Sequence, residues 1–174
     1  MTLSFTQAGP QHAAAMLAII EEAKAFMRQQ GLPQWQNGYP NMASVEEDIA
    51  KGQAYLLLAS GQPAGTLALC YEDDPTYHNI TNGSWRTNTR PYAAIHRVAA
   101  ASAYRGSNLA ATMMTNAEAI ARQSGFPSVR IDTHEQNQPM QKFLQKNGYQ
   151  RCGTIYLNGS TLPDDKRIAF EKIL

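Results

Sequence analysis

One stretch of the sequence, Tyr92–Ala121, constrains the fold more than any other. An apolar run ends in a short loop, Tyr104–Asn108, and a strongly helical segment follows at once. A strand that enters a helix through a turn of small residues leaves the first backbone N–H groups of the helix unpaired and directed at the turn. Together with the helix dipole, these groups form a site for a phosphate group. The stretch therefore predicts a phosphate-binding strand–turn–helix unit.

The residues of the turn exclude two familiar phosphate-binding loops. It has no Gly-Lys-Ser/Thr ending, as a P-loop would, and its single glycine rules out the three-glycine dinucleotide fingerprint. It resembles motif A of the GNAT N-acetyltransferase family, Arg/Gln-x-x-Gly-x-Gly/Ala, and reads Arg105-Gly106-Ser107-Asn108-Leu109-Ala110. Gly106 lets backbone approach a ligand closely, and Ser107 or Asn108 can cap the helix. Asn108 replaces the middle glycine, a mild departure because asparagine tolerates left-handed backbone best after glycine.

A second segment, Val129–Tyr156, reads as strand, short helix and strand. Asn137 stands where a helix N-cap belongs, and Gly148 suits the end of that helix. The segment is similar to motif B of the same family, Asn-x-x-Ala-x-x-Phe/Leu-Tyr-x-Lys-x-Gly-Phe. The matching positions are Asn137, Phe143, Lys146, Gly148 and Tyr149, whereas Met140 and Leu144 replace the usual alanine and tyrosine. Both motifs occur in the family's order, and the resemblance covers nearly the whole chain.

The pattern of apolar residues and breakers predicts a single domain over residues 1–174. The expected strands are 3–7, 54–59, 64–71, 92–100, 129–133, 150–157 and 167–173, and the expected helices are 10–30, 44–52, 109–124 and one between Asn137 and Gly148. The resemblance implies a GNAT-like α/β fold, splayed at the central strand. Its sheet would be mixed, mostly antiparallel and twisted, with about seven strands and about four helices on both faces.

Composition limits the class of protein. Apolar content of 43% and charged content of 17% are globular values, and a net charge of +1 indicates no nucleic-acid surface. No apolar run approaches the roughly 20 residues of a membrane helix, and the N-terminus lacks the features of a secretory signal. Cys70 and Cys152 read as buried thiols of a reduced cytoplasm. We expect a cytoplasmic protein without a membrane span, and no metal, because metal-ligand spacings are missing.

The resemblance also implies a reaction and a cofactor site. GNAT enzymes transfer an acetyl group from acetyl-CoA to a primary amine by direct attack. The pyrophosphate would bind backbone N–H groups of Arg105–Ala110, and the pantetheine would run along Val98, Ala99 and Ala100. A backbone N–H near Val98 or Ala99 would bind the thioester carbonyl with the geometry of an oxyanion hole. Asn137 would contact the cofactor arm in addition to capping its helix.

Two histidines are candidates for the catalytic base, since a group titrating near neutrality suits deprotonation of an ammonium. His96 lies in the central strand immediately before the expected bulge, and His134 lies at the end of the next strand. Asp132 and Glu135 are nearby alternatives. A packed, hydrogen-bonded structural role is the competing interpretation of both histidines.

The general acid of the family is missing, because its tyrosine position is Leu144. Departure of the thiolate would then rely on water or on another tyrosine, such as Tyr104 or Tyr156. The same substitution keeps a second hypothesis open, a non-catalytic acyl-CoA-binding module that acts as a sensor. A third hypothesis is a different protein that binds a phosphorylated ligand, such as a nucleotide, against which the match to motif B argues.

Clustered aromatic residues in turn-rich sequence predict the acceptor side. Trp35 and Tyr39 follow the first helix, and Tyr77 and Trp85 lie in the long polar segment Glu72–Arg90. They suit a wall around a small-molecule or peptide amine, or else a satellite core that pins the loops. The sequence leaves open which amine is acetylated and whether the chain forms a homodimer.

Overall fold

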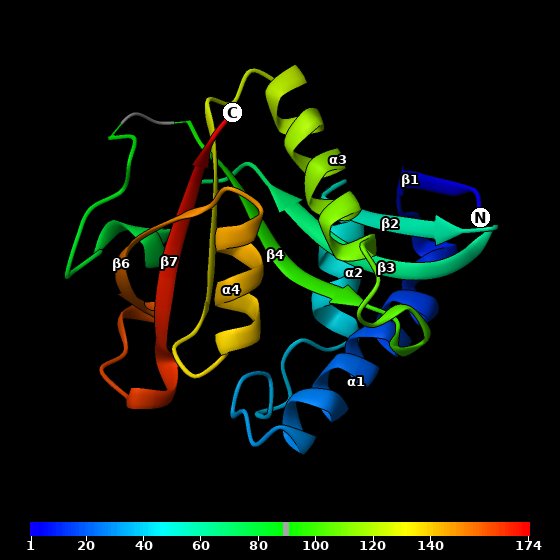
Figure 1. Ribbon diagram of the computed structural model, residues 1–174, viewed down its shortest axis with the longest axis horizontal. Coiled ribbons are helices and arrows are strands. Elements are labelled where there is room, and N and C mark those ends of the chain that lie inside the picture. The colour runs from blue at the N-terminus through cyan, green and yellow to red at the C-terminus, as the bar shows by residue number, and fades with distance from the viewer. Residues whose placement is uncertain (89–90) are drawn as a thin grey trace. The chain divides into compact units, whose positions relative to one another are not determined.

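The computed structural model describes residues 1–88 and 91–174 (Figure 1). The helices and strands follow in the order β1 (Leu3–Gln7), α1 (Ala13–Gln29), α2 (Met42–Ala50), β2 (Ala54–Ala59), β3 (Gln62–Cys70), β4 (Ala93–Ala100), α3 (Leu109–Gln123), β5 (Ser128–His134), α4 (Gln138–Lys146), β6 (Gln150–Tyr156) and β7 (Lys166–Ile173). Short 3-10 turns lie at Pro10–His12, Pro75–His78, Ser102–Tyr104, Leu157–Gly159 and Pro163–Asp165. Across the described ranges, no helix is long and apolar enough to cross a membrane.

The strands form a seven-stranded mixed sheet in the order β1-β2-β3-β4-β5-β7-β6. The pairs β1–β2, β2–β3, β5–β7 and β6–β7 are antiparallel, whereas β4 and β5 run parallel. The predicted fold class, a mostly antiparallel mixed sheet with four α-helices, is therefore confirmed. The chain divides into two compact units: residues 1–70 with 95–117, and residues 71–94 with 118–174.

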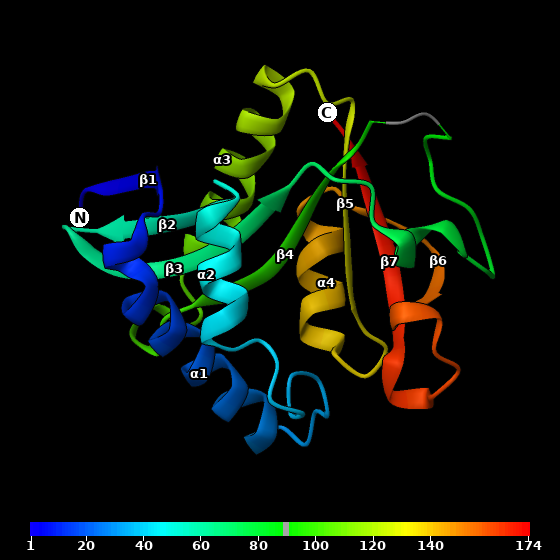
Figure 2. The same cartoon turned by 180° about the vertical axis from the view of Figure 1, so that it is seen from behind.

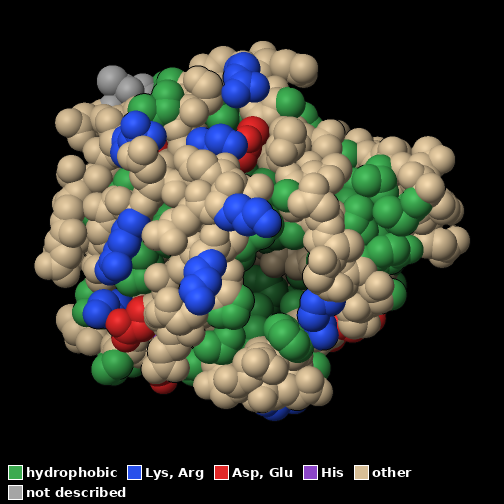
Figure 3. All heavy atoms as spheres, viewed as in Figure 1, with side chains coloured by type: hydrophobic (Ala, Val, Ile, Leu, Met, Phe, Trp, Pro, Cys, Tyr) green, Lys and Arg blue, Asp and Glu red, His purple; other side chains and the backbone are tan. Residues whose placement is uncertain are grey.

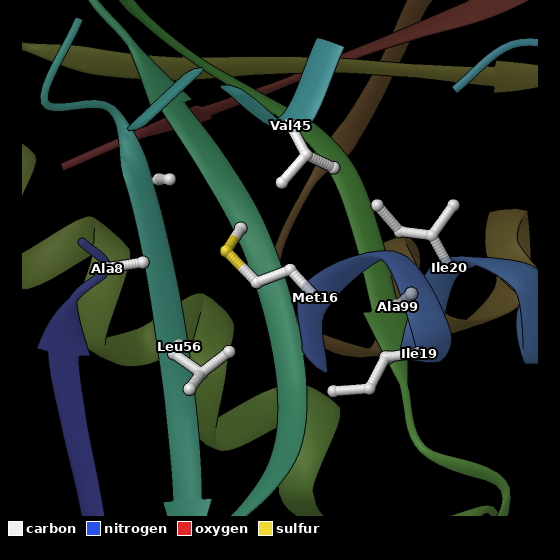
Figure 4. Packing of buried hydrophobic residues seen from close by; sticks show 8 residues of the cluster. Ala8, Met16, Ile19, Ile20, Val45, Leu56 and Ala99 are labelled. Atoms are coloured by element: carbon white, nitrogen blue, oxygen red, sulfur yellow. The ribbon is translucent and has the colours of Figure 1, made fainter. Parts of the chain in front are cut away.

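The first unit has its core between α1, α2 and the adjoining strands (Figure 4). The helical spacing of the apolar residues of α1 places Met16, Ile19 and Ile20 in this core, against Val45 of α2 and Leu56 of β2. Helix α3 covers the other face of β2 and β3 (Figures 1 and 2). The first unit is thus a three-layer arrangement, with the β3–β4 region of the sheet enclosed by helices.

The second unit is organised around a buried carboxylate. The side chain of Glu171 on β7 is 0% exposed and accepts hydrogen bonds from Ser128 Oγ at 2.7 Å and Arg130 Nε at 3.2 Å. It also accepts the backbone N–H groups of Arg86 and Thr87. Burial raises the pKa of Glu171, but the hydrogen bonds from the hydroxyls of Thr87 and Ser128, the charge of Arg130 and the N–H of Thr87 outweigh it and lower the pKa overall. The network fixes part of the long polar segment against β5 and β7.

Local hydrogen bonding explains two of the boundaries that differ from the prediction. Helix α2 begins at Met42, because the side chain of Asn41 accepts the N–H of Ser44 and the Oγ of Ser44 accepts the N–H of Asn41. Ser44, where the helix was expected to begin, therefore belongs to its first turn, and Asn41 is the cap. The β2–β3 turn comprises only Ser60 and Gly61, both with positive φ, and β3 begins at Gln62.

Surface charge on the face of Figure 3 is dispersed. Lys and Arg side chains lie apart from one another, separated by hydrophobic and uncharged polar surface. This arrangement agrees with the net charge of +1. The described surface in this view carries no continuous basic patch of the kind that binds nucleic acid.

Candidate functional site

Strand β4 contains a backbone irregularity at its centre. Its parallel pairing with β5 joins Ala93 to Val129 and Ala94 to Arg130, and β4 continues to Ala100. Arg97 has φ of 53°, in the left-handed region that residues with a Cβ rarely adopt. A left-handed residue breaks the regular alternation of a strand and redirects the backbone N–H groups beside it. This feature, the Arg97 kink, immediately follows His96, where the resemblance to the family implies a bulge.

The stretch after the Arg97 kink, Val98–Ala100, is only partly buried. Ala99 is 5% exposed and packs in the core of the first unit (Figure 4). The N–H of Ala101 donates to the carbonyl of Ala64 on β3 at 2.9 Å. A ligand along this stretch would therefore meet the backbone of Ala99, because its methyl group is already buried. Binding of the pantetheine by Val98, Ala99 and Ala100 stays a prediction.

The turn that follows β4 is built from backbone hydrogen bonds. The N–H of Arg105 donates to the carbonyl of Ser102 at 3.2 Å, and that of Ser107 donates to the carbonyl of Tyr104 at 3.1 Å. Gly106 has φ of 79°, and a Cβ added to it would meet nothing within 4 Å. The turn thus uses the conformational freedom of Gly106 and leaves open space beside it.

Helix α3 begins directly after this turn. The carbonyl of Asn108 accepts the first helical hydrogen bond, from Thr112 at 3.1 Å, and the N–H of Leu109 donates to Ser107 Oγ at 3.4 Å. The N–H groups of Ala110 and Ala111 belong to the first turn and have no partner within the helix. Asn108 is not among the described residues with positive φ. The left-handed position of the motif is Gly106, so asparagine at 108 requires no strained backbone.

Helix α1 supports the phosphate turn from beneath. Glu22 Oε2 accepts the N–H of Ser102 at 2.6 Å, and the guanidinium carbon of Arg105 lies 3.9 Å from the centroid of the Phe26 ring. Glu22 and Phe26 are one helical turn apart and face the same way. The hydrogen bond from Ser102 is the largest cause that lowers the pKa of Glu22. Because the charge of Arg105 rests on an aromatic ring, the turn offers a ligand mainly backbone groups.

The guanidinium of Arg97 is fully engaged with side chains of the first unit. Its Nε and Nη2 atoms lie 2.6 Å from the two carboxylate oxygens of Asp48 on α2, and Nη1 lies 2.6 Å from the hydroxyl of Tyr39. Burial lowers the pKa of Arg97, but the hydrogen bonds with Asp48 outweigh it and raise the pKa above its ordinary value.

The two predicted acceptor residues after α1 differ in exposure. Tyr39 is 44% exposed, whereas Trp35 is half-buried against the core of the first unit.

The two candidate bases lie in different environments. His96 on β4 is half-buried. His134, at the end of β5, is 1% exposed, and its Nδ1 accepts the N–H of Gln136 at 3.1 Å. A neutral imidazole that accepts at Nδ1 carries its proton on Nε2. Nε2 has no hydrogen-bond partner in the described part of the chain, and burial, followed by the charge of Arg167, lowers the pKa of His134. His134 therefore presents an unpaired N–H donor.

The other predicted acceptor aromatics are buried. Tyr77 and Trp85 pack with ring centroids 5.0 Å apart, and the indole N–H of Trp85 donates to the carbonyl of Tyr77 at 2.9 Å. The Tyr77 hydroxyl donates to Asp132 at 2.8 Å, and burial raises its pKa well above the ordinary value. This packing matches the satellite-core interpretation, so acceptor contacts by these two residues stay a prediction. Thr89 and Arg90, at the end of the polar segment, lie outside the described residues.

The motif B residues occupy helix α4 and its ends. Asn137 caps α4, because its Oδ1 accepts the N–H of Met140 at 3.2 Å. Leu144, at the position of the family's acid, is 0% exposed. Tyr149 is 2% exposed and donates to Glu118 at 2.9 Å, and burial raises its pKa well above the ordinary value. Tyr149 therefore packs in the interior, and its hydroxyl is engaged by Glu118.

Comparisons with known proteins agree with the fold. The acetyltransferase (GNAT) family matches residues 17–149. A GNAT-family acetyltransferase from Streptococcus agalactiae 2603 is 32% identical over 99% of this chain and 95% of its own, with a TM-score of 0.88. The PaiA N-acetyltransferase of Thermoplasma acidophilum in complex with coenzyme A is 17% identical over 100% of both chains, with a TM-score of 0.72. No curated protein matches the sequence. The chain belongs to the GNAT acetyltransferase family and is an acyltransferase.

Proposed function

We propose that this acyltransferase is an N-acetyltransferase that moves an acetyl group from acetyl-CoA to a primary amine by direct attack. The observation that carries the proposal is the turn at Gly106, whose left-handed backbone and open space precede the unpaired first-turn N–H groups of α3. An anionic pyrophosphate fits such a cradle. The coenzyme A bound by the Thermoplasma relative supports this choice of phosphorylated ligand.

The turn and β4 would bind different parts of acetyl-CoA. Backbone N–H groups of Arg105–Ala110 would hold the pyrophosphate, and the backbone of Val98, Ala99 and Ala100 would hold the pantetheine. Asn137 would add a contact to the cofactor arm. The family match spans residues of both compact units, and β4 itself passes from one unit to the other. We therefore infer that residues 1–174 act as one acetyltransferase domain.

Acetyl-CoA supplies the thioester whose acetyl group is transferred. Backbone N–H groups beside the Arg97 kink, at Val98 or Ala99, would stabilise negative charge on the carbonyl oxygen. His96 would accept the proton that the ammonium must lose before attack. As the C–N bond forms and the C–S bond breaks, the second amine proton leaves and the thiolate gains one. Because Leu144, at the usual acid position, has no proton to give, water would carry the second amine proton to the departing thiolate.

The acceptor would bind near Trp35 and the exposed Tyr39, and its class is a small-molecule or peptide amine. A structural neighbour, the NatC complex, is bound to a Gag peptide and CoA. That neighbour is 13% identical, so it supports a peptide acceptor only as one alternative. The free thiols of Cys70 and Cys152 are buried, which suits a reducing compartment such as the cytoplasm.

Calorimetric titration with acetyl-CoA, followed by an amine panel scored for released CoA thiol, tests the proposal. Binding with turnover on an amine would support the transferase and name its acceptor class. Binding without turnover on any amine would favour the acyl-CoA sensor, for which the buried Leu144 at the acid position is the specific argument. Absence of binding would refute the assignment of the turn to the pyrophosphate of CoA. Displacement of acetyl-CoA by ATP at equal concentration would refute it too, and would favour a nucleotide as the ligand.

A further inference from the structure

We propose that Arg97 is a positioning residue that couples the acceptor loop, residues 30–41, to the part of β4 that polarises the thioester. The inference rests on the proposed function and deepens it, because it links the amine side of the reaction to the thioester side. Arg97 contacts both α2 and this loop through one guanidinium. It acts through Val98 and Tyr39 and is not itself a catalytic residue.

The backbone of Arg97 requires an external restraint. Its φ of 53° is unfavourable for a residue with a Cβ, and such a conformation persists only when the surroundings hold it. Arginine has no side-chain group that favours left-handed backbone, as asparagine has. The groups that the Arg97 side chain binds can supply such a restraint.

Asp48 provides that restraint. Its two oxygens hold Nε and Nη2 of Arg97 in a bidentate arrangement, which fixes orientation as well as distance. The side chains of Arg97 and Asp48 are 15% and 9% exposed, so solvent screens this ion pair little. Asp48 itself is held by α2, which is capped at Asn41 and anchored in the core by Val45. The pair thus ties the Arg97 kink to a rigid element.

The third contact extends the restraint to the acceptor loop. Nη1 of Arg97 donates to the Tyr39 hydroxyl at 2.6 Å, although Tyr39 is 44% exposed and the loop has no regular structure of its own at this point. The hydroxyl is held from one side, and the ring is left available to an acceptor. A shift of the loop on amine binding would therefore be transmitted through Arg97 to the N–H groups of the next residues of β4.

Four variants of the full chain test this coupling. Asp48→Asn removes the charge from the restraint, and Tyr39→Phe removes only the exposed hydroxyl. Arg97→Gly keeps the left-handed backbone without strain but removes the guanidinium. Glu47→Gln is the matched control, because Glu47 is the neighbouring carboxylate of α2 and pairs at the surface with Lys51. Each variant is measured by steady-state kinetics with the amine found in the panel, by CoA titration, and by hydrogen–deuterium exchange of residues 30–41.

The proposal predicts a split between kinetic constants. Asp48→Asn and Arg97→Gly should lower kcat by about 10- to 100-fold, the range expected when reacting groups are misplaced by about 1 Å. Tyr39→Phe should raise the KM of the amine by about threefold to tenfold, the range that corresponds to loss of one ordinary hydrogen bond at an exposed side chain. CoA affinity should stay within about twofold of wild type in all of them, because the phosphate turn is untouched. Exchange of residues 30–41 should quicken in all three and not in the control.

Two results would overturn the coupling. Arg97→Gly with wild-type kinetics and exchange would mean that only the backbone conformation matters. Unchanged exchange of residues 30–41 in Tyr39→Phe and Asp48→Asn, with a lower Tm as the sole effect of Asp48→Asn, would reduce the ion pair to a stability element. The exchange measurement needs no turnover, so failure of the transferase assay would refute the proposed function and leave the coupling tested separately.

Discussion

Substitution of Gly106 by alanine separates the role of the phosphate turn in folding from its role in binding CoA. An added Cβ would meet nothing within 4 Å, so steric overlap with the protein contributes nothing to the change in stability. The remaining term is the left-handed backbone, with φ of 79°. It costs a residue with a Cβ roughly 1–2 kcal/mol, offset by about 0.4–1 kcal/mol from the reduced freedom of the unfolded chain. We expect a net loss of about 1 kcal/mol, or about 2–4 °C in Tm.

The effect on CoA affinity should be larger than the effect on stability. A methyl group in the open space displaces the pyrophosphate from the backbone N–H groups that would hold it. One lost charge-assisted hydrogen bond of about 1.5–3 kcal/mol weakens binding about 10- to 100-fold. Gly106→Trp should abolish binding, because the indole would occupy the same space. Calorimetric titration measures the affinities, and thermal unfolding measures the stabilities.

Gly125 offers a matched control for this measurement. It has φ of 85° at the end of α3, and its Cβ would also meet nothing within 4 Å. Gly125→Ala should therefore lower Tm by a similar amount and leave CoA affinity unchanged. If Gly106→Ala and Gly125→Ala bind CoA equally well, the reasoning that places the pyrophosphate at Gly106 is refuted.

Three further perturbations follow from the site. His134→Leu removes an unpaired donor and one acceptor, so thermal stability should change by less than about 1 kcal/mol while kcat falls. Because the pKa of His134 is lowered from 6.5, its contribution to wild-type stability is present above pH 6.5 and lost as the pH falls through the folded pKa; His134→Leu should flatten that part of a Tm–pH profile. Glu22→Ala should weaken CoA binding measured by titration, whereas Glu21→Ala, at an exposed carboxylate paired with Lys24, should not. His96→Ala should lower turnover chiefly at low pH, and a full rate across the pH profile would assign the base elsewhere.

Much of the fold follows from local signals in the sequence. The strands β1 and β2 and the start of α3 fall where apolar periodicity and breakers predict them, because these signals depend on a few adjacent residues. The start of α2 was missed by two residues, because the mutual hydrogen bonds of Asn41 and Ser44 begin the helix at Met42 and not at Ser44. The strand order is a matter of long-range pairing, and periodicity does not encode it.

The candidate site was less accessible to sequence reasoning. The phosphate turn could be predicted because its glycine and its helix start are contiguous in the chain. Asp48 could not be found, because a carboxylate in a short amphipathic helix reads as solvent-exposed, and its partner Arg97 is remote in sequence. The donor state of His134 depends on the N–H of Gln136, a contact set by the backbone after β5. From its residue type alone, His134 was predicted to be a base.

The two carboxylates of the first unit that support the proposed site raise a question of charge. A carboxylate near a site for an anionic cofactor opposes binding, and burial makes this repulsion stronger. Glu22 is compensated by the N–H of Ser102 and the charge of Arg105, and Asp48 by the bidentate Arg97. The neighbouring groups thus neutralise each negative charge. The effect of each carboxylate on the site is then to orient the backbone that it holds. Glu22→Gln then distinguishes the two effects: tighter CoA binding would indicate uncompensated repulsion, and weaker binding would indicate that the carboxylate orients the turn.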